Sequence, residues 1–161
     1  MSFELFHNGK PILVNCGTYA YQSDKRAFFR STAAHNTVMV KGIEQSQCWG
    51  AFRVGKASSV RVIESCDTCL VLELKDQIGN VIKRSISISD DECHICDTAM
   101  GKCLQAYYHT QDCIFLPQVC EGEASFEDML YSPDYGNYDS VRTLKVEGMD
   151  RISVSFPLLI K

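Results

Sequence analysis

The sequence predicts an all-β fold, a two-layer antiparallel β-sandwich of roughly ten or more strands. Short runs alternate apolar and polar residues nearly throughout the chain, which is the period of a strand with one buried face. Glycine, proline and asparagine separate these runs every ~8–12 residues, as in a sandwich built from hairpins. No segment of about ten or more residues has helical periodicity. The three observations agree on one fold class.

The expected strands share this alternation and follow one another along the chain. Residues 85–89, Ser-Ile-Ser-Ile-Ser, have the regular alternation of a strand with one face in solvent. Turns are expected at Gly42, Gly101, Gly122 and Gly148 and within 78–80 and 133–137. The expected strands cover residues 36–40, 59–63, 69–74, 81–88, 104–109, 113–116, 141–146 and 152–156.

Length and composition indicate one domain over residues 1–161. With 45% hydrophobic and 22% charged residues, the chain is long enough to bury a core without staples. The net charge is −4, and no more than two Lys or Arg residues are adjacent in the sequence. Both observations argue against nucleic acid as a partner. An acidic polymer would have to use a local basic patch. The candidates for it all lie in the first third: Lys25, Arg26, Arg30, Arg53 and Lys56.

The N-terminus and the cysteines bear on location. Residues 1–6 resemble the entry of a strand, with neither a signal peptide nor a membrane span. The nine cysteines are an odd number and many lie in apolar runs, which favours reduced thiols and a reducing compartment. The sequence leaves open whether this is a periplasmic or a cytoplasmic bacterial protein.

The segment 30–40 (RSTAAHNTVMV) is the most informative part of the sequence. It begins with Arg30 and carries the pair His35 and Asn36 at the start of an expected strand. Histidine transfers protons near neutral pH, and an asparagine amide donates hydrogen bonds to anionic oxygens. The pair therefore suits an acidic substrate. The alternative is a histidine that is only hydrogen-bonded at a sheet edge.

This segment, with 9–21 (GKPILVNCGTYAY) before it and 45–55 (QSQCWGAFRVG) after it, resembles the C-terminal β-sandwich of the heparinase II/III family of polysaccharide lyases. The resemblance implies a lyase C-terminal-type sandwich that acts on or binds an acidic, uronic-acid-containing polysaccharide. In the complete protein, the polysaccharide would be cleaved by β-elimination. A helical (α/α) toroid, expected to be missing from this fragment, would supply further catalytic groups. The resemblance implies a catalytic role for His35 and substrate binding by Arg30, Asn36, Arg53, Tyr19 and Tyr135. Ala33 stands where some relatives carry a second histidine.

Other assignments stay open. The alternative is a stand-alone carbohydrate-binding, accessory or structural module without catalysis. We expect the chain alone to be inactive. No cofactor is assigned; zinc or calcium is present in some relatives, and His35 and His109 are weak candidate ligands. The two C-x-x-C pairs, Cys66 with Cys69 and Cys93 with Cys96, have the spacing of a zinc ribbon but lack its glycines.

Overall fold

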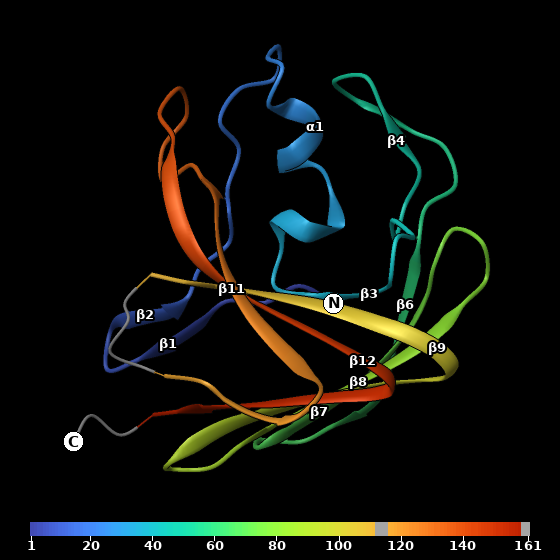
Figure 1. Ribbon diagram of the computed structural model, residues 1–161, viewed down its shortest axis with the longest axis vertical. Helices are drawn as coiled ribbons and strands as arrows, with labels where there is room; N and C mark the ends of the chain where they lie inside the picture. The colour runs from blue at the N-terminus through green and yellow to red at the C-terminus, as the bar shows by residue number, and fades with distance from the viewer. Residues whose placement is uncertain (112–115, 159–161) are drawn as a thin grey trace.

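The computed structural model describes residues 1–111 and 116–158, which are almost entirely β-structure (Figure 1). The only helices among them are α1 (Arg26–Phe29) and the 3-10 turn η1 (Thr32–Ala34). The strands are β1 (Leu5–His7), β2 (Lys10–Leu13), β3 (Val38–Val40), β4 (Cys48–Trp49), β5 (Arg53–Val54), β6 (Ser59–Ser65), β7 (Cys69–Lys75), β8 (Val81–Ile88), β9 (Glu92–Thr110), β10 (Gln118–Glu121), β11 (Glu123–Tyr131) and β12 (Asp139–Pro157).

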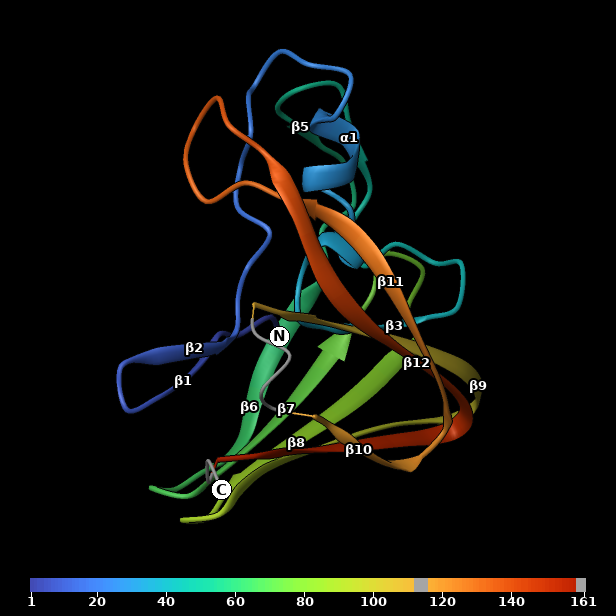
Figure 2. The ribbon, with the colours of Figure 1, turned by 60° about the vertical axis from the view of Figure 1, so that its left-hand side comes forward.

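One antiparallel ten-stranded sheet forms both layers of the sandwich. The first half of β9 pairs with β8, and β7 and β6 continue this layer to its edge. The second half of β9 pairs with β3 and with the first half of β12, whose other neighbour is β11. Figures 1 and 2 show β9 (yellow) and β12 (red) turning back together, so the two strands carry the sheet from one layer into the other. The predicted two-layer antiparallel fold is confirmed.

The bend in these two strands has a local cause. Gly101 in β9 has φ of 67° and Asp150 in β12 has φ of 60°, values that a regular strand does not adopt. The pairing register also shifts between Met149 and Arg151. A bulge of this kind bends a strand and increases its twist. The turns expected at Gly101 and Gly148 are therefore bends, and the strands expected at 141–146 and 152–156 are two parts of β12.

The remaining strand predictions differ in outcome. Those over 59–63, 69–74 and 81–88 fall on β6, β7 and β8. The first half of β9 and all of β11 were not expected, because cysteines in β9 and acidic residues in β11 hide the alternation. The strand expected at 113–116 lies, except for its last residue, outside the described residues.

The main core lies between the layers and consists of apolar side chains from alternate strand positions. Its buried members include Leu74, Ile82, Leu104 and Leu144. A fully buried ion pair interrupts it, because Arg84 on β8 forms two hydrogen bonds of 2.7 and 2.8 Å with the carboxylate of Asp97 on β9. Burial opposes the charge of Arg84, yet the Asp97 carboxylate keeps its pKa above the usual value.

The loops gather at one end of the sandwich. Figure 1 shows α1, the β4–β5 hairpin and the β11–β12 loop projecting to the same side. Below them a smaller core contains Val14, Phe29, Ala34 and Val141. Within the described part of the chain, neither helix has the length and apolar character needed to cross a membrane.

Candidate functional site

His35 lies directly after η1 and before β3, at the loop end of the sandwich. Its N–H donates to the carbonyl of Thr32 and its own carbonyl accepts from Thr37, so both sides of its backbone are fixed. The side chain is half-buried, with Nδ1 3.2 Å from Oδ1 of Asn15. An amide oxygen only accepts hydrogen bonds, so this contact places the ring proton on Nδ1. The neutral ring then carries its basic lone pair on Nε2.

Glu44 holds the turn that leads to His35. Both the backbone N–H and the hydroxyl of Thr32 donate to Oε2 of Glu44, over 2.7 and 2.6 Å. Hydrogen bonds to a carboxylate are stronger than neutral ones. Because Thr32 begins η1, this carboxylate fixes the start of the turn that presents His35.

Gln45 fixes the other side of the same segment. Its amide donates to the Thr37 hydroxyl over 2.9 Å and to the Val38 carbonyl over 2.7 Å. Its backbone N–H donates to the hydroxyl of Thr32 over 3.0 Å. Glu44 and Gln45 thus hold the chain on both sides of His35.

A cavity of about 250 Å³ lies beside this segment. Arg30, His35, Glu44, Gln45 and Val54 contribute to its walls. It therefore brings together a cation, an imidazole and a carboxylate from positions separated by up to 14 residues (30 to 44). Such convergence of polar groups in a concave site is typical of a ligand-binding pocket.

The protonation of His35 depends on burial and on two nearby charges, of which the N-terminal ammonium group also lowers its pKa. Burial lowers its pKa, because the charged imidazolium is poorly solvated there, whereas the nearby Glu44 carboxylate raises it. Burial prevails, so the pKa lies below the usual value. At neutral pH His35 is consequently uncharged and able to accept a proton.

The two predicted arginines meet at the β4–β5 hairpin. The Arg30 guanidinium donates to the carbonyls of Gly50 over 2.7 Å, Arg53 over 3.0 Å and Trp49 over 3.5 Å. These three bonds leave at least two of its five N–H groups without a protein partner. Arg30 lines the cavity, whereas the exposed side chain of Arg53 does not. Arg30 therefore both braces the hairpin and keeps donors for a ligand.

Asn36 differs from the expectation for a substrate contact, because its side chain is completely buried. Its amide donates to the carbonyls of Phe3 and Val14 over 2.9 and 3.0 Å. Its Oδ1 accepts from the backbone N–H of His109 over 2.7 Å. All these partners are protein groups, so in this structure Asn36 joins three segments beneath His35.

His109 is buried on β9 below the same site. Its Nδ1 lies 2.8 Å from the hydroxyl of Thr143, and its Nε2 has no hydrogen-bond partner. Burial lowers its pKa to about 4; the backbone of Ala33 opposes this change, and the nearby His35 lowers the pKa further. Within residues 1–111 and 116–158, no three His, Cys, Asp or Glu side chains are grouped to hold a metal ion. Two imidazoles, one sealed from solvent, do not fit a zinc or calcium centre.

The tyrosines lie outside the cavity. Tyr19 is half-buried and packs edge-on against Tyr138, with ring centroids 5.0 Å apart. Tyr135 is 64% exposed in the β11–β12 loop and lies 5.6 Å from the ring of Tyr21. The loop that carries Tyr135 is tied to Tyr19 by a 2.7 Å hydrogen bond from the N–H of Gly136.

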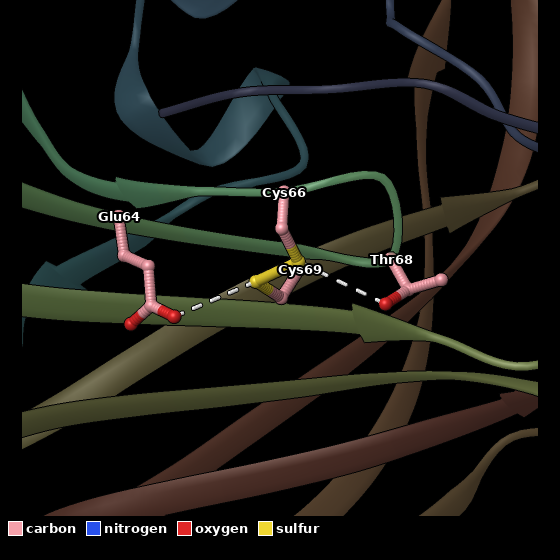
Figure 3. The surroundings of a disulfide bond; sticks show 4 residues. All are labelled: Glu64, Cys66, Thr68 and Cys69. Carbon is pink, nitrogen blue, oxygen red and sulfur yellow. Dashed lines mark hydrogen bonds between the residues drawn. A yellow bond between two sulfur atoms is a disulfide. The ribbon is translucent and has the colours of Figure 1, made fainter.

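The cysteine pairs do not form a zinc ribbon. Cys66 and Cys69 are joined by a disulfide at the β6–β7 turn, where Figure 3 also shows Glu64 and Thr68 beside the sulfurs. Cys93 and Cys96 are buried free thiols on β9. Three positions apart on a strand, they face opposite sides of the sheet and cannot share an ion. Burial raises the pKa of Cys93 to about 11.

A sequence model of the heparinase II/III-like C-terminal family matches residues 1–103, well over half of the chain. The chain belongs to this family. The match includes η1, His35, the Glu44–Gln45 pair and the β4–β5 hairpin, and the chain is thus a domain of a polysaccharide lyase family. No curated protein matches the sequence.

Solved structures confirm the fold of this heparinase II/III-like domain. Heparinase III, the BT4657 gene product, is 16% identical with a TM-score of 0.74, and the match covers 99% of this chain and 30% of that one. Heparan sulfate lyase HepC from Pedobacter heparinus, in a mutant form, is 16% identical with a TM-score of 0.70, covering 97% and 30%. The domain thus spans about 30% of the length of these chains.

Glu44 and Asn15 are the site residues that sequence reasoning missed in this family member. Asn15 lies in the matched segment 9–21, and Glu44 directly precedes the segment 45–55. Their position within or next to these segments is the one available signal. Their contacts with His35 and Thr32 depend on how distant loops pack, which no local pattern encodes.

Proposed function

We propose that this domain binds an acidic, uronic-acid-containing polysaccharide at the His35 cavity and takes part in its β-elimination within the complete protein. The observation that carries this proposal is the neutral, half-buried His35 beside the remaining N–H donors of Arg30 in one cavity. Membership of a polysaccharide lyase family supports the substrate class.

β-Elimination needs three things from the protein. A base removes the proton next to the uronate carboxylate, donors neutralise the charge that develops on that carboxylate, and an acid protonates the leaving oxygen. His35 offers a basic Nε2, because its Nδ1–H is held by Asn15. Arg30 offers a planar fork that matches a carboxylate. Arg53 extends the positive charge along the same hairpin.

The remaining predicted residues take different parts in this proposal. Asn36 positions the segment under His35 rather than contacting the sugar, because its amide is used inside the protein. Tyr19 and Tyr135 lie on a neighbouring aromatic cluster. We expect the other proton-transfer groups to come from a helical toroid and not from this domain. The 161-residue chain alone should therefore release no unsaturated uronide.

Binding of heparan sulfate oligosaccharides to the 161-residue chain, measured by calorimetry, tests the proposal. We expect His35→Gln to weaken binding by roughly tenfold, about 1.4 kcal/mol. His7→Gln is the matched control, because His7 is also partly exposed but lies on β1, outside the cavity. Equal affinity of an uncharged glucan, or unchanged binding by His35→Gln, would contradict the proposal. A structural module without sugar binding would then be the better account.

A further inference from the structure

We infer that the exposed rings of Tyr21, Phe52 and Tyr135, with Arg26 beside them, form a second sugar-contact surface for the same acidic polysaccharide. We call these three rings the aromatic surface. The inference rests on the proposed function and extends it from one cavity to a longer stretch of polymer.

The aromatic surface is assembled from three segments that are distant in sequence. Tyr21 lies in the β2–α1 loop, Phe52 at the tip of the β4–β5 hairpin, and Tyr135 in the β11–β12 loop. The ring of Tyr21 is 5.6 Å from each of the other two rings, centroid to centroid. Figures 1 and 2 show these three loops at the same end of the molecule.

The exposure of these rings is unusual for a cluster. Tyr21 is 48% exposed, Phe52 67% and Tyr135 64%, so the rings contact one another while much of their area faces solvent. Single exposed apolar side chains need no explanation, but a contiguous patch marks a binding surface. The core clusters of the domain include none of the three.

A cation accompanies the rings. The guanidinium of Arg26 lies 5.2 Å from the Tyr21 ring centroid, and its Nε donates to the Ala51 carbonyl over 3.2 Å. Arg26 is thereby held between Tyr21 and the hairpin. The neighbouring Lys25 is less available, because it lies 3.6 Å from the carboxylate of Asp24. Arg26 is therefore the group that complements a sugar carboxylate or sulfate.

The aromatic surface continues from the His35 cavity through one structural element. Cys48 and Val54 of the β4–β5 hairpin line the cavity, whereas Phe52 at its tip belongs to the aromatic surface. Arg30 fixes the hairpin by its bonds to the carbonyls of Gly50 and Arg53. An extended polymer seated in the cavity thus has the aromatic surface next along its path.

The chemistry of the patch favours a sugar over a protein partner. A pyranose ring presents a flat face of C–H groups, which packs on an aromatic ring, and hydroxyl groups at its edge, which pair with polar tips. Two of the three rings are tyrosines with such tips, and Arg26 adds the charge that an acidic sugar requires. A purely apolar docking site for a protein would not need this cation.

The affinity of the 161-residue chain for heparan sulfate oligosaccharides of increasing length tests the inference. We expect Phe52→Ala and Tyr135→Ala each to weaken the binding of long oligosaccharides by roughly tenfold and of disaccharides much less. Phe126→Ala is the matched control, since Phe126 is 45% exposed with Arg142 4.7 Å from its ring but lies on β11. Thermal unfolding of each variant checks that the fold is intact.

The outcomes separate the two proposals. Wild-type affinity of Phe52→Ala and Tyr135→Ala, with binding still weakened by His35→Gln, would overturn the aromatic surface alone. Absence of binding by the wild-type chain would overturn both. Self-association that Phe52→Ala abolishes, with sugar binding unchanged, would assign the patch to a protein partner and also overturn the inference.

Discussion

Asn36 and His109 are joined by a 2.7 Å hydrogen bond from the backbone N–H of His109 to the side-chain oxygen of Asn36. The bond ties the segment that carries His35 to the long strand β9. Because the amide of Asn36 also donates to two carbonyls, the residue satisfies two buried backbone groups and a partly buried one at once. Asn36, next to His35, is therefore needed to hold the fold together.

Asn36→Ala should consequently destabilise the domain strongly. Each buried group left without a partner costs about 1–3 kcal/mol, so we expect a loss of about 3 kcal/mol or more in the free energy of unfolding. Urea denaturation measures it. Asn137→Ala, at an exposed loop position, is the control and should change the value by less than about 0.5 kcal/mol. A small effect of Asn36→Ala would show that the three groups find other partners.

The buried pair of Arg84 and Asp97 should be sensitive to loss of one partner. Asp97→Asn leaves the guanidinium of Arg84 in the core without its counter-charge, which we expect to cost about 3–5 kcal/mol. The exposed cross-strand pair Arg61 and Glu73 is the control. Glu73→Gln should change the free energy of unfolding far less, because solvent screens an exposed ion pair. Equal effects in chemical denaturation would mean that burial of the first pair has no energetic consequence.

His109 should make stability depend on pH. Its pKa is about 4 in the folded domain and about 6.5 when exposed, so between these values only the unfolded chain takes up the proton. The free energy of unfolding should therefore fall by about 3 kcal/mol as the pH drops from about 6.5 to about 4. His109→Gln removes this contribution. If urea denaturation gave wild type and variant the same dependence of the free energy of unfolding on pH, the predicted role of His109 would be contradicted.

The sequence predicted the fold class because strand alternation is local, as in residues 81–88, which match β8 throughout. It also located His35 and Arg30, which the structure places in one cavity. It did not predict that Asn36 faces inward, because the neighbours that occupy its amide come from residues 3, 14 and 109. Nor did it predict that β9 and β12 cross both layers, since Gly101 and Gly148 signal a turn and a bend alike.

A side chain at Gly17 should destabilise the domain more than one at Gly9. Its φ is +75°, and a Cβ there would lie 2.2 Å from the carbonyl oxygen of Ser132 in the β11–β12 loop. Gly9 has nearly the same φ, +74°, with nothing within 4 Å of an added Cβ. Gly9→Ala should cost about 1 kcal/mol for the positive φ alone. We expect Gly17→Ala to cost about 2 kcal/mol more by chemical denaturation. Equal costs would mean that the two loops separate easily.

Glu44 should control the proton affinity of His35. Glu44→Gln keeps an oxygen that accepts from the N–H and hydroxyl of Thr32, so the turn before His35 stays in place. The variant removes the negative charge that raises the pKa of His35, whereas burial of the imidazole continues to lower it.

The pKa of His35 should therefore be lower in Glu44→Gln than in wild type, as measured by NMR titration of the imidazole carbon-bound protons. Glu123→Gln, an exposed position on β11, is the control and should leave it unchanged. If His35 is the base in β-elimination, the acidic limb of the pH–rate profile of the complete lyase should move to lower pH in the Glu44 variant. An unchanged or higher pKa would show that Glu44 acts on His35 through the turn alone and not through its charge.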